Sequence, residues 1–278
     1  MLFFGTAGIP ITTQKKSSIN GIKRVRELGL DALELEFVYG VKMSKTLAQK
    51  IKMVAKEHNV HLTAHGPYYI NLNSLKRETV KASIDRILKT ARTTKIAGGK
   101  SITFHVATYG EAKPESVYKT VKEHLSPIIK ALQEEGNNVW IRPETTGKKS
   151  QFGTLGELIK LSQEIEQVLP AVDFAHLNAR TNGESNRYQH FESVLSKLEN
   201  GLGREILDNM HIHISGVEYS PKGEIRHITL AESDINYEEL IKSWKDYKIK
   251  GIVISESPNI EFDALLLKKI YESKTEEH

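Results

Sequence analysis

The stretch HLTAHGPYYINLNS, residues His61–Ser74, joins a predicted strand to a polar loop. Apolar and polar residues alternate from Val60 to His65, which is typical of a strand with one apolar face and one face turned to polar groups. Gly66 and Pro67 interrupt that pattern, so the imidazole of His65 is expected at a strand end beside an exposed loop. A single histidine of this kind is also consistent with a hydrogen-bonded core residue. Whether His65 belongs to a functional site or to the core therefore depends on how the other predicted strands end.

A strand followed by a helix is the repeating unit of this sequence. Eight such units favour a closed (β/α)8 TIM barrel of the α/β class over an open doubly wound sheet, and we expect one domain over residues 1–278. No glycine-rich G-x-G-x-x-G motif follows the first strand, which counts against dinucleotide binding. The predicted strands are Leu2–Thr6, Ala32–Val38, Val60–His65, Ser101–His105, Val139–Ile141, Ala171–Asp173, Met210–Ile214 and Gly251–Ser255. The predicted helices are Ser18–Leu28, Ser44–Glu57, Leu75–Ile96, Glu115–Leu132, Thr154–Glu164, Phe191–Leu198, Tyr237–Tyr247 and Phe262–Ser273.

The composition limits the chemistry that this chain can perform. It has no cysteine, which excludes disulfides, thiol catalysis and cysteine zinc sites, so any metal must be held by His, Asp or Glu. Its formal net charge of +4 is compatible with a polyanionic partner. No stretch resembles a signal peptide or a membrane span. We therefore expect a cytoplasmic protein with no membrane partner.

Potential metal ligands follow six successive predicted strands. Because the active site of a barrel lies at the carboxyl ends of its strands, these side chains are expected to converge. Such a set would repel or shift its pKa values strongly unless cations neutralise it. Nitrogen and oxygen donors suit Zn²⁺, with Mn²⁺ or Fe²⁺ possible, and a central carboxylate can bridge two ions. The ligands are His65, His105, Glu144, Asp173 with His176, His213 and Glu256.

Four motifs are specific enough to indicate a family. They are HGPYYINL from His65 to Leu72, E-T-T-G at Glu144–Gly147, D-x-x-H at Asp173–His176 and R-H-x-x-L-x-E at Arg226–Glu232. In these motifs and their order, nearly the whole chain resembles the endonuclease IV family, metal-dependent apurinic/apyrimidinic endonucleases with a xylose isomerase-like TIM barrel.

The resemblance implies two or three zinc ions and a role for each ligand. The first ion would be held by His65, His105 and Glu144, the second by Glu144, Asp173, His213 and Glu256, and the third by His176 and His227. Glu144 would then be the bridging and catalytic ligand. Tyr68 corresponds to an aromatic residue that inserts into DNA at the lesion. Three further residues lie in loops after the fifth and sixth strands and are candidate phosphate contacts: Lys148, Lys149 and Arg180.

The implied function is zinc-dependent cleavage of the phosphodiester 5′ to an abasic site, by metal-activated hydroxide, in DNA base-excision repair. The partner would be double-stranded DNA with abasic sites, and the protein is expected to be a monomer. Two other functions stay open. One is a sugar isomerase or epimerase of the same superfamily, using one metal and the pair Glu144 and Glu256 for proton transfer. The other is a barrel that binds DNA without catalysis.

Two positions depart from the family pattern. Ile225 occupies the place of an acid two residues before His227, and Gly216 occupies the place of the acid in the family's H-x-N-D motif. The third metal site is therefore expected to be the weakest. His211 shares a strand face with His213 but lies deeper, which indicates either a core residue or a neighbour of the site.

Overall fold

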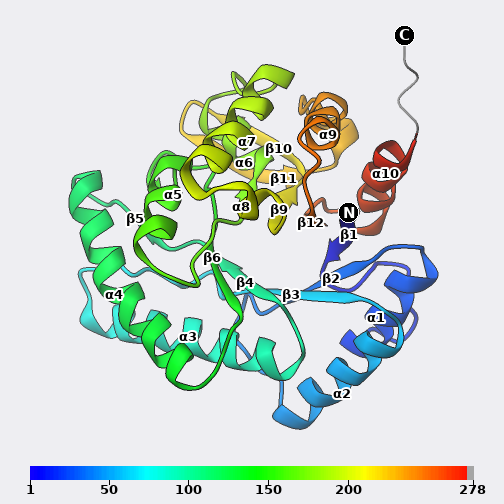
Figure 1. Ribbon diagram of the computed structural model, residues 1–278, viewed down its shortest axis with the longest axis horizontal. Coiled ribbons are helices and arrows are strands. Elements are labelled where there is room, and N and C mark those ends of the chain that lie inside the picture. The colour runs from blue at the N-terminus through cyan, green and yellow to red at the C-terminus, as the bar shows by residue number, and fades with distance from the viewer. Residues whose placement is uncertain (274–278) are drawn as a thin grey trace.

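A computed structural model describes residues 1–273 and confirms the predicted TIM barrel (Figure 1). Eight parallel strands form one sheet in the order β6-β4-β3-β2-β1-β12-β9-β8. Its two edges meet where Leu169 and Ala171, just before β8, donate hydrogen bonds to the carbonyl oxygens of Ile141 and Pro143 in β6. These hydrogen bonds join the two edges of the sheet and close the barrel. The strands are β1 (Leu2–Ala7), β2 (Ala32–Glu36), β3 (His61–His65), β4 (Ser101–Phe104), β6 (Trp140–Pro143), β8 (Val172–Asp173), β9 (Met210–Ile214) and β12 (Gly251–Ser255).

The helices lie outside the strands (Figure 1). Their starts follow from capping residues in the sequence. Ser17 and Ser44 each accept a hydrogen bond from a main-chain N–H of the first turn, and Thr154 and Glu157 form a capping box. The helices of the eight units are α1 (Ser18–Glu27), α2 (Lys45–Glu57), α3 (Arg77–Ile96), α4 (Pro114–Glu134), α5 (Leu155–Glu164), α7 (Tyr188–Leu202), α9 (Tyr237–Asp246) and α10 (Glu261–Glu272). No helix within residues 1–273 is both long and apolar enough to cross a membrane.

The period-two alternation divides the strand residues between two environments. Large apolar side chains such as Phe104, Ile212 and Val253 are buried in the main core between strands and helices, as predicted. A separate small apolar cluster contains Ala32, Ile252 and Ile254. The remaining buried strand residues are largely polar, among them Thr63, Thr103, Glu34, His211 and His213. The barrel interior therefore contains a small apolar cluster and a polar centre.

Several elements were not predicted from the sequence. The loop after β9 forms an antiparallel hairpin of β10 (Gly216–Ser220) and β11 (Gly223–Ile228), followed by the 3-10 helix η1 (Leu230–Glu232). Short strands β5 (Ala107–Thr108) and β7 (Gln151–Phe152) pair with each other, and α6 (Phe174–Arg180) and α8 (Arg204–Leu207) are additional helices. These segments have two to seven residues each, which is too short for a hydrophobic period to identify an element.

Candidate metal centre

A cavity of about 380 Å³ lies beyond the carboxyl ends of the barrel strands. The loops after β3, β4, β6 and β12, together with α6 and β11, supply its walls. Histidine and acidic side chains make up much of its lining: His65, His105, Glu144, His176, Glu224, His227 and Glu256. The ligands expected at the strand ends are thus brought to one place.

Glu144 occupies the middle of this group. It is buried, and its Oε2 lies 3.4 Å from Nε2 of His65 and 3.3 Å from Nε2 of His105. Its Oε1 lies 3.3 Å from Nδ1 of His176 and 3.2 Å from Nδ1 of His213. One carboxylate therefore contacts four imidazoles, with a different pair at each oxygen. This is the arrangement that a bridging ligand requires.

The ligand atoms form overlapping groups in which all atoms lie within 4.8 Å of one another. One group is Glu144, Asp173, His213 and Glu256; a second is His105, Glu144 and His176; a third is His176, Glu224 and His227. Within these groups the ion-pair contacts between ring nitrogens and carboxylate oxygens measure 3.2–3.7 Å. Ligand atoms bound to one tetrahedral zinc ion at ~2.1 Å are about 3.4 Å apart. The residues present therefore fit a zinc centre.

Two of the compact groups contain a residue that the predicted division of ligands between ions did not assign to them. His65 contacts Glu144 as expected, but the compact group around His105 and Glu144 takes His176 as its third member. His176 thus belongs to two groups: its Nδ1 lies 3.3 Å from Glu144 and its Nε2 lies 3.5 Å from Glu224, and the neutral ring would give one of these nitrogens to a metal. The ligand groups form a continuous series joined at Glu144 and His176.

Three of the histidines that line the cavity have a main-chain carbonyl oxygen beside Nδ1. Such a carbonyl accepts a hydrogen bond from the protonated Nδ1 and leaves the lone pair of Nε2 available for a metal. The distances are 2.7 Å from His65 to Gly66, 3.0 Å from His176 to Thr145 and 3.3 Å from His227 to Glu256. This main-chain support orients the three rings toward the cavity.

A β-bulge supplies the acid that the sequence lacks at Ile225. In the β10–β11 hairpin, Glu218 pairs with Arg226 and Tyr219 pairs with Glu224, so Ile225 is the extra residue. A bulge of this kind can redirect neighbouring side chains. Ile225 is 54% exposed, whereas Glu224 turns inward, with its Oε1 3.7 Å from Nε2 of His227. The third ligand group therefore contains an acid one residue earlier than the family pattern predicts.

Replacing Glu224 with alanine is expected to remove about one zinc ion per chain, because the third group would keep only its two histidines. Elemental analysis of the zinc-loaded variant measures this loss. Ile225→Ser is the matched control, since its side chain faces solvent. Equal zinc content in the wild type and Glu224→Ala would show that Glu224 is not a ligand.

The second departure from the family pattern has a steric cause. A Cβ atom on Gly216 would lie 2.2 Å from the carbonyl oxygen of Thr229. The hairpin therefore leaves no space for the acid expected at this position.

The charges of the centre shift its pKa values strongly. Burial would lower the pKa of His65, but Glu144 and two further carboxylates outweigh burial and raise it to about 10. Burial likewise favours the neutral acid at Glu256, but His213 and other groups lower its pKa to about 2. Protonated histidines thus balance the carboxylates in the metal-free protein. A bound cation would take the place of these protons.

The predicted DNA-contacting residues lie in different surroundings. Tyr68 is 60% exposed at the cavity, and its ring centroid lies 5.5 Å from that of His65. Lys148 also lines the cavity, but Lys149 and Arg180 are not among the described residues that do so. Nη1 of Arg180 instead donates hydrogen bonds to loop oxygens, including the carbonyl of Lys148 at 2.6 Å. In this structure Arg180 stabilises the loop that carries Lys148.

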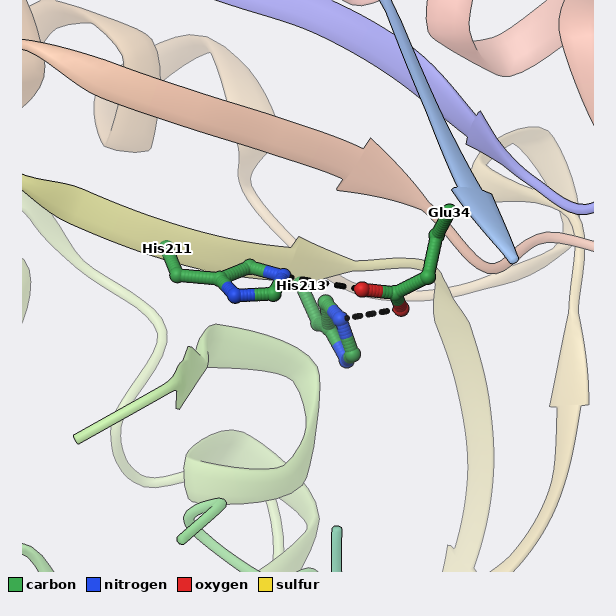
Figure 2. Close-up of side chains that lie close together, drawn as sticks. All are labelled: Glu34, His211 and His213. Atoms are coloured by element: carbon green, nitrogen blue, oxygen red, sulfur yellow. Dashed lines mark ion pairs between the residues drawn. The ribbon is translucent and has the colours of Figure 1, made fainter. Parts of the chain in front are cut away.

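Sequence reasoning missed one buried acid beside the centre, Glu34 of β2. Figure 2 shows this side chain directed at His211 and His213 on β9. Glu34 and His211 are buried and lie outside the groups centred on Glu144. His211 is therefore a neighbour of the site, one of the two roles expected for it. The available signal was the strand ALELE at residues 32–36, in which Glu34 lies between two leucines in the interior of a predicted strand.

Comparison with known proteins gives the family. Residues 22–274 match the model of the xylose isomerase-like TIM barrels. The chain belongs to this family. An uncharacterized protein of Methanocaldococcus jannaschii is 44% identical over 271 residues, which cover 98% of this chain and 97% of that protein. Xylose isomerase-like TIM barrels are enzymes, so the family supports an enzymatic role.

Solved structures with a similar fold have two kinds of activity in their names. A D-tagatose 3-epimerase-like protein superposes with a TM-score of 0.72 and 18% identity, covering 95% of each chain. Endonuclease IV from Thermus thermophilus superposes with a TM-score of 0.70 and 17% identity, covering 96% of this chain and 97% of that one. At these identities the similarity establishes the fold alone.

Proposed function

We propose that the protein is a zinc-dependent endonuclease that cleaves the DNA phosphodiester 5′ to an abasic site. The observation that carries the proposal is the series of overlapping ligand groups joined at Glu144 and His176. Such a series can hold two or three ions side by side, as metal-dependent phosphodiesterases do. A reaction that uses one metal does not require the additional groups containing His105, His176, Glu224 and His227.

The proposed chemistry needs no protein nucleophile. Zinc bound in this centre would lower the pKa of a water molecule and stabilise charge on the phosphate and on the leaving 3′-oxygen. Glu144 would fix the spacing of two ligand groups, since each of its oxygens contacts different histidines. Main-chain carbonyls would hold His65, His176 and His227 in orientation. Lys148, at the cavity wall, would offer a positive charge to a phosphate.

Duplex DNA with an abasic site is the partner that we propose. Extruding a nucleotide costs least where the base is already missing, so a lesion of this kind is the easiest to admit to a pocket. The loop after β3 presents two exposed aromatic side chains, Tyr68 and Tyr69, and Tyr39 lies close to Tyr68 with 6.4 Å between ring centroids. Aromatic rings at the rim can stack on bases or fill the space of an extruded nucleotide.

A sugar epimerase is the second candidate, and one observation favours it. The group of Glu144, Asp173, His213 and Glu256 can hold a single ion without the other ligands. Glu144 and Glu256 would then be the groups that remove and return a proton. A small sugar would not need an exposed aromatic residue at the rim, so Tyr68 distinguishes the two proposals.

Tyr68→Ala is expected to weaken binding to abasic duplex DNA roughly tenfold or more, because an aromatic contact with nucleic acid is worth ~1–3 kcal/mol. Fluorescence anisotropy with duplexes that contain or lack one abasic site measures this change. Metal content should stay unchanged, since Tyr68 lies outside the ligand groups.

Leu75→Ala is the control for this experiment, because Leu75 is fully exposed and is not among the described residues that line the cavity. Wild-type protein that shows no preference for abasic DNA, or Tyr68→Ala that binds it equally well, would favour the epimerase.

A further inference from the structure

Glu34 forms a buried contact between β2 and β9, beside the proposed metal centre (Figure 2). Its Oε1 lies 2.8 Å from Nε2 of His213, and its Oε2 lies 3.0 Å from Nε2 of His211. Thr63 donates a hydrogen bond of 2.7 Å to the same Oε2. The carboxylate is fully buried, and Glu34 is not among the described residues that line the cavity, so it is not placed to touch a substrate there.

His213 uses its two ring nitrogens differently from the three histidines supported by main-chain carbonyls. Its Nδ1 faces the ligand group, 3.2 Å from Glu144 and 3.4 Å from Glu256, while Nε2 faces Glu34. A metal binds the unprotonated nitrogen of a neutral imidazole, so the ring proton must lie on Nε2. Glu34 is therefore placed to accept a hydrogen bond from this Nε2–H group. It offers a charged acceptor, whereas the other three rings face a neutral main-chain carbonyl.

The cluster of Glu34, His211 and His213 could instead be a metal site in its own right. Glu34, His211 and His213 are close enough to hold an ion of their own. Oε1 of Glu34 and the Nε2 atoms of the two histidines have no aligned hydrogen bond, whereas Oε2 of Glu34 accepts one from Thr63. Their separations of 2.8 and 3.0 Å are nevertheless shorter than the 3.2–3.7 Å found in the groups around Glu144. They are also shorter than the spacing of about 3.4 Å around zinc, and they match direct N–H to oxygen contacts.

We infer that Glu34 is a positioning residue for the metal centre. It fixes the His213 ring with Nδ1 toward Glu144 and strengthens that nitrogen as a ligand. Thr63 and His211 hold the carboxylate in place, and His211 is held in turn by Ser101, whose Oγ lies 3.0 Å from its Nδ1. This inference rests on the metal centre of the proposed function and is independent of which reaction follows.

Glu34→Gln tests the inference by zinc affinity, measured without DNA. The amide removes the negative charge at nearly constant volume, so affinity for the ion held by His213 is expected to fall ~10- to 100-fold. Competition with a chromogenic chelator measures this affinity. In protein loaded with Co²⁺, the visible absorption of the ion bound to His213 should also change. A purely structural substitution would leave that spectrum unaltered.

Two further variants complete the experiment. Glu261→Gln replaces a buried acid that accepts hydrogen bonds from the N–H groups of Ile11 and Thr12, on the outside of the barrel. It should keep wild-type zinc affinity and cobalt spectrum even if it lowers stability. His211→Ala removes one support of Glu34 but no proposed ligand, so it should retain the full number of ions.

The possible results separate the alternatives. Wild-type zinc affinity and cobalt spectrum in folded Glu34→Gln would overturn the inference. Loss of one ion from His211→Ala would also overturn it, because the cluster would then be a metal site itself. If circular dichroism shows that Glu34→Gln does not fold, Glu34→Asp provides the same test, since its shorter side chain keeps the charge but cannot reach both rings. Zinc affinity, ion number and cobalt spectrum are all measured without DNA, so they test the inference even if the protein does not cleave DNA.

Discussion

Glu144→Ala is expected to reduce cleavage at abasic sites by at least ~10³-fold, which corresponds to about 4 kcal/mol of transition-state stabilisation. The reason is that this one carboxylate contacts four histidines from four different segments of the barrel. Its removal would withdraw a ligand from two groups at once, so zinc content should fall by more than one equivalent. Kinetic assays with zinc-saturated protein, together with elemental analysis, measure both effects.

The matched control is Glu123→Ala, the same substitution at an exposed position of α4. It should leave activity and zinc content unchanged. If Glu144→Ala folds normally by circular dichroism and still cleaves abasic DNA at the wild-type rate, Glu144 is not the bridging ligand.

Removing the metals is expected to abolish activity and to lower thermal stability. Zinc that binds only the folded state at 1,000 times its dissociation constant stabilises that state by ~4 kcal/mol. The melting temperature should therefore fall after chelation and rise again when zinc is restored, together with activity. Differential scanning calorimetry and the cleavage assay follow the two properties. Full activity in protein shown by elemental analysis to be free of metal would contradict the metal centre.

The metal-free protein should also have a distinctive dependence on pH. His65 has a pKa of about 10 in the folded state against 6.5 ordinarily, so its protonated form stabilises folding. That contribution is complete below pH 6.5 and is lost as pH rises toward 10. Zinc replaces the proton, so the loss should be much smaller in the zinc-bound protein. Urea unfolding at pH 6, 8 and 9.5, with and without zinc, compares the two forms.

The barrel and the ligand positions could be predicted because both depend on short periods in the sequence. Alternation along strands such as β3 and β9 shows which residues face inward, and glycine or proline marks where some strands end. Since parallel strands in a barrel end on the same face, ligands far apart in sequence could be expected to meet. His65, His105, Glu144 and Glu256 illustrate this directly, because each lies at or immediately after a strand end.

Other features depend on backbone detail or on distant partners, which periodicity does not encode. The inward turn of Glu224 results from a bulge at Ile225, and a regular hairpin would not be expected to place it this way. Glu34 is visible as an acid between two leucines of β2, but its histidine partners lie on β9, which is not adjacent to β2 in the sheet. Arg180 was named as a candidate phosphate contact because it is basic and near the site, but periodicity gave no sign that it ends α6 and donates hydrogen bonds to the loop after β6.

Incision of a duplex that carries one abasic site is the most direct test of the central claim, a multi-metal centre that hydrolyses phosphodiesters. Zinc-reconstituted wild-type protein is incubated with the labelled duplex, with an intact duplex of the same sequence and, separately, with ketose sugars. We expect a single cut immediately 5′ to the abasic site that leaves a 3′-hydroxyl, no cut in intact DNA and no epimerised sugar. Protein with its metal sites filled that leaves the abasic duplex uncut while epimerising a sugar would contradict the proposal.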